Sequence, residues 1–168
     1  MSLISKLPLN PDFIYDSIYD IDIMKLNEMG ICALFFDLDS TLMKSKSAKF
    51  SYKTLQFLKD LRLNFKLVII TNNTNTDYIK KAQEQTDIPI YYNAKKPCID
   101  KIMCACVDLN IQPEKTAFIG DRPLSDILAG KNAGMVTILV DSISKTEETP
   151  LVRFVRFLER LTIQKNRN

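Results

Sequence analysis

Residues 32–41 read CALFFDLDST, an apolar run that ends abruptly in acidic and hydroxyl side chains. A short segment that is apolar at nearly every position is typical of a strand buried on both faces of a parallel sheet. Asp37 and Asp39 would then lie at the carboxyl end of a central strand, where open α/β sheets bind ligands. Two carboxylates about 4 Å apart repel by roughly 4 kcal/mol at an effective dielectric of about 20, which favours a bound divalent cation. Taken alone, residues 39–41 are also compatible with a helix cap or an Asx turn.

Further apolar segments end in polar residues of complementary kinds. Strands are predicted at 66–70, 90–92, 116–120 and 136–140, and helices are predicted between them, which indicates an α/β fold. We expect a three-layer, doubly wound, Rossmann-like parallel sheet with right-handed crossovers. Because parallel strands end at one edge of the sheet, we expect a single site there. Its candidate residues are Asp37, Asp39, Thr71, Asn72, Lys96, Asp121 and Asp126.

The composition suits one compact domain spanning residues 1–168. The chain has 168 residues, of which 46% are hydrophobic, and a net charge of +3 from 23 basic and 20 acidic side chains. This near balance does not indicate a nucleic-acid partner. No apolar run approaches the roughly 18 to 20 residues of a membrane span, and the first residues do not resemble a signal peptide. We therefore expect a cytoplasmic protein and leave open peripheral contact with the inner membrane face, as well as the oligomeric state.

The cysteine and histidine content excludes several kinds of site. Cys32, Cys98, Cys104 and Cys106 form no CxxC pair, and the chain contains no histidine. A structural zinc site and nucleophiles activated by histidine are therefore not expected. Catalysis would have to rely on carboxylates, lysine, hydroxyls or a metal ion.

Both ends of the chain have features of their own. We interpret residues 1–30 as an N-terminal packing arm, with a short helix or turns across the edge of the sheet. Residues 148–164 predict a C-terminal amphipathic helix, whose apolar positions alternate with three arginines and which Lys165 follows. Such a helix either packs on the domain or lies in a membrane interface, and the sequence allows both.

The intervals between the strand tips predict that there is no cap domain. Only 29 residues separate Thr41 from Thr71, and 24 separate Thr71 from Lys96. Each interval is already occupied by a predicted helix and strand. An uncapped site can admit a phosphate carried by a large or surface-bound molecule.

The motifs at the strand tips resemble those of the haloacid dehalogenase (HAD) superfamily, subfamily IIIA. They are Asp37-Leu38-Asp39-Ser40-Thr41, Thr71-Asn72-Asn73, Lys96-Pro97 and Gly120-Asp121 with Asp126. The flanking sequence is similar to the YqeG-like group, and that group is similar to phosphatidylglycerophosphate phosphatases. Ser40 departs from the asparagine that is commoner in the group, at a position with no chemical role.

The resemblance implies a role for each candidate residue. Asp37 would be the nucleophile that forms an aspartyl-phosphate, and Asp39 the general acid and base. Thr71 and Asn72 would bind phosphoryl oxygens, and Lys96 would neutralise the charge shared by phosphate and nucleophile. Mg²⁺ would be held by Asp37, the Asp39 carbonyl, Asp121 and Asp126, the last directly or through water. Thr41 would orient the loop.

The expected function is therefore a magnesium-dependent phosphomonoester hydrolase, with phosphatidylglycerophosphate as the best substrate hypothesis. A phosphatase of a soluble phosphorylated metabolite is the main alternative. A non-catalytic adaptor that binds phosphate and magnesium is another, although a scaffold has no need of a general acid at Asp39. A receiver-type signalling domain fits less well, because it places its acid pair and its phosphorylated aspartate on different strands.

Overall fold

The computed structural model describes residues 10–144, 149–151 and 158. Six strands form one parallel sheet in the order β1-β6-β5-β2-β3-β4. Their bounds are β1 Phe13–Tyr15, β2 Ala33–Phe36, β3 Lys66–Ile70, β4 Ile90–Tyr91, β5 Thr116–Gly120 and β6 Val136–Val140. All five pairings between neighbouring strands are parallel.

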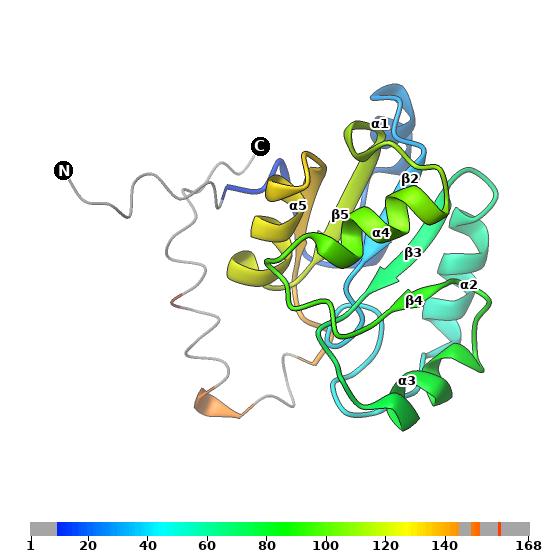
Figure 1. The fold of residues 1–168 in the computed structure, drawn as a ribbon, viewed down its shortest axis with the longest axis vertical. Helices are drawn as coiled ribbons and strands as arrows, with labels where there is room; N and C mark the ends of the chain where they lie inside the picture. Colours follow the sequence, from blue (N-terminus) through cyan, green and yellow to red (C-terminus); the bar gives the residue numbers. More distant parts are fainter. Residues whose placement is uncertain (1–9, 145–148, 152–157, 159–168) are drawn as a thin grey trace.

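Helices cover both faces of this sheet (Figure 1). The α-helices are α1 Ile23–Glu28, α2 Tyr52–Leu61, α3 Thr76–Gln83, α4 Asp100–Asp108 and α5 Leu128–Asn132. Shorter helical turns are η2 Ile18–Asp20, η3 Pro113–Lys115 and η4 Pro123–Ile127, the last of π type. The predicted three-layer, doubly wound α/β fold is confirmed.

Alternate residues of the central strand divide the core into two layers. Leu34 and Phe36 of β2 pack in a cluster with residues of α1, α2 and α3. Ala33 and Phe35 face the opposite layer, which contains residues of α4 and α5. Because β2 is fully buried on both faces, its sequence is continuously apolar rather than alternating. The strand that carries Asp37 at its end is thus fixed on both sides.

The N-terminal arm differs in part from the expectation. Residues 13–15 add an edge strand beside β6, where we expected a helix or turns, and short helices follow only at η2 and α1. The Asp12 carboxylate accepts hydrogen bonds from the Thr137 backbone N–H (2.7 Å) and hydroxyl (2.9 Å) of β6, and it pairs with Lys131 at 2.6 Å. Three partly exposed residues are too few to show the alternation of apolar and polar side chains that is typical of a strand.

Some expectations about the rest of the chain stay predictions. Of the helix predicted at 148–164, only residues 149–151 and 158 lie in the described part. The described residues between β2 and β3 form a loop and α2, and those between β3 and β5 form α3, β4, α4 and η3. The absence of a cap domain and the single domain over 1–168 both stay predictions. In the described part, no helix combines the length and the apolar character that a membrane span requires.

The close approach of α5 to the sheet leads to a stability prediction. A Cβ at Gly130 would lie 2.7 Å from Thr137 Cγ2 and 2.9 Å from Phe118 Cβ. We expect Gly130→Ala to lower the free energy of unfolding by about 1–3 kcal/mol, because α5 must move off the sheet. Urea unfolding followed by circular dichroism measures this. The control is Asn132→Ala at an exposed position of the same helix. Equal unfolding midpoints for the two variants would show that a methyl group at residue 130 fits between α5 and the sheet.

Candidate active site

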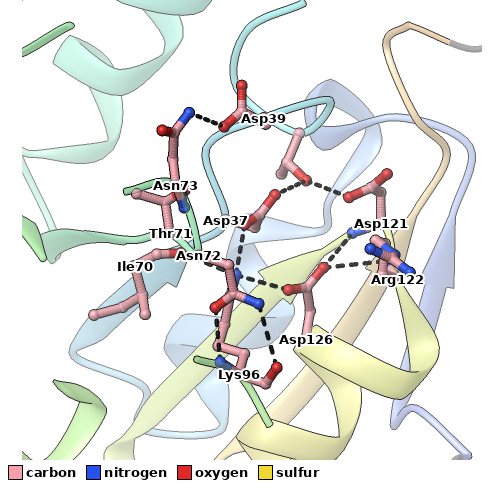
Figure 2. A network of polar contacts seen from close by, with 11 residues as sticks. Asp37, Asp39, Ile70, Thr71, Asn72, Asn73, Lys96, Asp121, Arg122 and Asp126 are labelled. Carbon is pink, nitrogen blue, oxygen red and sulfur yellow. Dashed lines mark hydrogen bonds and ion pairs between the residues drawn. The ribbon is translucent and has the colours of Figure 1, made fainter. Parts of the chain in front are cut away.

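The candidate residues come together at the carboxyl edge of the sheet. Asp37 follows β2, Thr71 and Asn72 follow β3, and Asp121 follows β5. Lys96 comes from the segment after β4, and Asp126 lies in η4. Figure 2 shows these side chains converging from separate segments of the chain. The shared strand direction brings them to one edge, as the sequence predicted.

A buried lysine joins three of these segments. The Lys96 ammonium lies 2.5 Å from Asp37 Oδ1 and 2.7 Å from Asp126 Oδ1, and it donates to the Ile70 carbonyl at 2.9 Å. Lys96 is 6% exposed, Asp37 8% and Asp126 1%. The two carboxylates raise the pKa of Lys96 against the opposing effect of burial. The lysine therefore stays charged and holds the ends of β2, β3 and η4 together.

Both oxygens of Asp126 are used within the site. While Oδ1 pairs with Lys96, Oδ2 accepts the backbone N–H groups of Asp121 (3.1 Å) and Arg122 (3.0 Å). The π-type turn η4 carries Asp126 back over the end of β5. Gly120 permits this approach, since a Cβ there would lie 2.4 Å from the Asp126 side chain. Asp126 thus shapes the loop that presents Asp121.

Three buried carboxylates meet at this edge of the sheet. Oxygens of Asp37, Asp121 and Asp126 lie within 4.8 Å of one another. The Thr41 hydroxyl lies 3.1 Å from Asp121 Oδ1 and 3.3 Å from Asp37 Oδ2, which places it between two of them. Burial, together with the neighbouring carboxylates, raises the pKa of Asp37, although Lys96 opposes this.

This cluster suits a hard divalent cation. Lys96 pairs with two of the three carboxylates, Asp37 and Asp126, and all three lie together in a site shielded from water. Carboxylate oxygens are the ligands that Mg²⁺ prefers, and such an ion would offset the repulsion among the three close carboxylates. The donor set of this chain therefore fits magnesium.

Asp39 lies apart from the cluster and has its own partners. Its carboxylate accepts a hydrogen bond from Tyr78 Oη at 2.5 Å and one from Asn73 Nδ2 at 3.2 Å. Burial, together with the hydrogen bond and charge of Asp39, raises the pKa of Tyr78, so the phenol stays a donor. Sequence reasoning missed Tyr78, because one aromatic residue on an amphipathic helix looks like a core residue. Asn73 belongs to the Thr71-Asn72-Asn73 motif, but the motif did not indicate a role for it.

The residues after β3 support the segment that carries Lys96. The Asn72 side chain accepts from the Lys96 backbone N–H at 2.7 Å and donates to the Lys96 carbonyl at 3.2 Å. The buried Thr71 hydroxyl accepts the Asn73 backbone N–H at 3.1 Å. The Asn72 side chain is thus committed to the backbone of residue 96, a use that the sequence did not indicate. The expected contacts of Thr71 and Asn72 with a phosphoryl group stay predictions.

Comparison with known proteins shows which family the chain resembles. Residues 94–155 match the family model described as HAD-hydrolase-like. The chain is 29% identical over 150 residues to "Probable phosphatase YqeG" of Bacillus subtilis, and the match covers 89% of this chain and 87% of that protein. The chain is therefore similar to HAD-like hydrolases in sequence over most of its length. A shorter match is 46% identical over 41 residues to an Arabidopsis thaliana phosphatidylglycerophosphate phosphatase, and it covers 24% of this chain and 12% of that protein.

Solved structures of HAD-like proteins share the fold. A HAD phosphatase from Thermococcus onnurineus aligns with a TM-score of 0.54 at 13% identity, over 71% of this chain and 89% of that one. The cobalt-bound deoxy-D-mannose-octulosonate 8-phosphate phosphatase of Haemophilus influenzae aligns with a TM-score of 0.53 at 15% identity, over 69% of this chain and 70% of that one. At these identities, the structural likeness supports the fold alone. The sequence relative and the family model together indicate a phosphatase.

The buried ion pairs lead to a prediction for Lys96→Met. Removing the ammonium leaves two buried carboxylates without their counter-charge, so we expect the free energy of unfolding to fall by about 3–5 kcal/mol. Thermal and urea unfolding in the presence of a chelator measure this loss without compensation by a metal ion. The matched control is Lys95→Met, which changes the exposed neighbouring lysine. If both variants unfold alike, the buried pairs contribute nothing to stability.

Proposed function

We propose that this chain is a magnesium-dependent phosphomonoester hydrolase that works through an aspartyl-phosphate. The observation that carries the proposal is the placement of Asp37. Its buried carboxylate lies at the end of β2, with Lys96 on one oxygen and Thr41 on the other. A carboxylate of this kind, beside a fixed cation and two further acidic groups, suits attack on an anionic phosphoryl group.

The first step transfers the phosphoryl group to the enzyme. An oxygen of Asp37 attacks phosphorus, and the bond from phosphorus to the alcohol oxygen breaks. Asp39 gives its proton to the departing alkoxide, which leaves as the alcohol. The hydrogen bonds from Tyr78 and Asn73 hold the Asp39 carboxyl in one orientation for this transfer.

The second step regenerates the enzyme. Asp39, now ionised, takes a proton from water, and the resulting hydroxide displaces phosphate from Asp37. Lys96 lowers the electrostatic repulsion between the carboxylate and the anionic phosphoryl group. Thr71 and the second N–H of the Asn72 amide, which the Lys96 carbonyl does not use, would bind the phosphoryl oxygens. Asp37, Asp121 and the Asp39 carbonyl would hold magnesium, with Asp126 reaching it through water because its own oxygens are bound. When bound, the ion neutralises negative charge on the phosphoryl group.

We propose phosphatidylglycerophosphate as the substrate. Two observations support it: the short match to a phosphatase of that lipid, and the basic amphipathic character of residues 148–164. A helix of this kind can lie in a membrane interface and would bring the site to its substrate. A soluble phosphorylated metabolite is the alternative substrate, and a non-catalytic adaptor is the alternative function.

The nucleophile assignment predicts the effect of Asp37→Asn. We expect purified protein to release phosphate from p-nitrophenyl phosphate in the presence of magnesium, and chelation to abolish this release. Asp37→Asn should lower kcat on the order of 10⁴-fold or more, because the attacking carboxylate is lost. The control is Asp100→Asn, on an exposed position of α4. Full activity of Asp37→Asn would reject the nucleophile, and inactivity of the wild type on every phosphate tested would favour the adaptor.

The substrate proposal predicts a preference among phosphate esters. We expect kcat/KM for phosphatidylglycerophosphate in mixed micelles to exceed that for soluble sugar phosphates and nucleotides by at least about tenfold. Phosphate release measured at equal concentrations of magnesium and detergent tests this. A soluble ester that is hydrolysed much faster than the lipid would reject the lipid substrate and leave the phosphatase proposal intact.

A further inference from the structure

A hollow of about 520 Å³ lies against the Asp39 carboxylate. The loop after β2 and the segment that leads from β3 into α3 form its walls. The residues that line it are Asp39, Ser45, Lys46, Asn73, Asn75 and Tyr78. Lys96, Asp121 and Asp126 are absent from this lining, so the hollow is separate from the buried carboxylate cluster.

The hollow presents hydrogen-bond donors that are not in use. Over residues 10–144, neither an ion pair nor a hydrogen bond engages the Lys46 ammonium or the Ser45 hydroxyl. Asn75 caps α3 by accepting the Tyr78 backbone N–H through Oδ1, which leaves its amide N–H groups for another partner. These donors lie in one hollow with Asp39, whose own oxygens are bound by Tyr78 and Asn73.

The loop that carries Lys46 is pinned in an uncommon conformation. Lys46 and Ala48 have φ values of 63° and 48°, in the left-handed region that non-glycine residues rarely adopt. Gln85 holds this loop, since its side chain donates to the Ala48 carbonyl at 2.8 Å and accepts the Phe50 backbone N–H at 3.1 Å. The surrounding structure therefore fixes the backbone strain at Lys46.

We propose that this hollow binds the leaving group of the substrate, and that Lys46 recognises a second anionic phosphate on that group. The inference rests on the proposed function, because Asp39 marks the leaving-group side only if it protonates the departing oxygen. Among the residues that line the hollow, Lys46 is the one with a positively charged side chain. A phosphate diester or monoester, linked by a short alcohol to the phosphate under attack, matches this arrangement.

A second hollow adjoins the first. It measures about 830 Å³, shares Lys46, Asn75 and Tyr78 with the first, and adds Lys49 and Lys81. Asp77 and Glu84 also line it, so the excess of positive charge there is small. We therefore assign recognition of the second phosphate to the first hollow. The neighbouring hollow leaves room for the part of the substrate beyond that phosphate.

Three soluble substrates test this proposal without micelles. The first is glycerol 3-phosphate, which has one phosphate. The second is the same molecule with a methyl phosphodiester on its far hydroxyl, and the third is glycerol 1,3-bisphosphate. We expect wild-type kcat/KM to be at least about tenfold higher for a substrate with the second anion, since a charged hydrogen bond is gained. Preference for the diester would indicate a lipid-type headgroup, and preference for the bisphosphate a free second phosphate.

Variants of Lys46 complete the test. Lys46→Met should reduce the ratio of kcat/KM between two-anion and one-anion substrates to near one, and Lys46→Arg should restore most of it. The control is Lys80→Met on the exposed side of α3, which should leave the ratio unchanged. An unchanged ratio in Lys46→Met, with phosphate release intact, would overturn the subsite and spare the proposed function. Failure of the wild type to hydrolyse any phosphate would overturn both.

Discussion

The site depends on a buried ammonium group. Lys96 lies between Asp37 and Asp126 with almost no contact with water, and its remaining donor reaches the end of β3. A charge in this position is tolerated only when paired and hydrogen-bonded, so each of the three partners supports the others. The nucleophile assigned to Asp37 is thus held by the same group that would neutralise the phosphate.

The site divides into a rigid interior and a separately supported rim. In the interior, Asp126 fixes the backbone at 121 and 122, and Gly120 leaves the space that its side chain needs. At the rim, Asp39 is half-buried and oriented by Tyr78 and Asn73. This division suits a reaction in which the phosphoryl group stays in one place while different alcohols leave on the other side.

The sequence was sufficient for the parts of the structure that follow from strand patterns. Continuous apolar runs predicted β2, β3, β5 and β6, and parallel strand direction then predicted that Asp37, Thr71 and Asp121 meet at one edge. The contacts that the sequence could not predict depend on the directions in which side chains point. The hydrogen bond of Tyr78 to Asp39, the bridge of Thr41 between two carboxylates and the double use of Asp126 all join residues through space. The edge strand β1 was missed because three residues carry no measurable period.

That edge strand has a consequence for truncated forms of the protein. β6 would form the border of the sheet if β1 and the Asp12 contacts with Thr137 were removed. Its outer row of backbone N–H and C=O groups would then be open to pairing with other chains, which is a common route to aggregation. A shortened protein that starts after Tyr15 would therefore be prone to aggregation. It would still keep every candidate catalytic residue, since these all lie further along the chain.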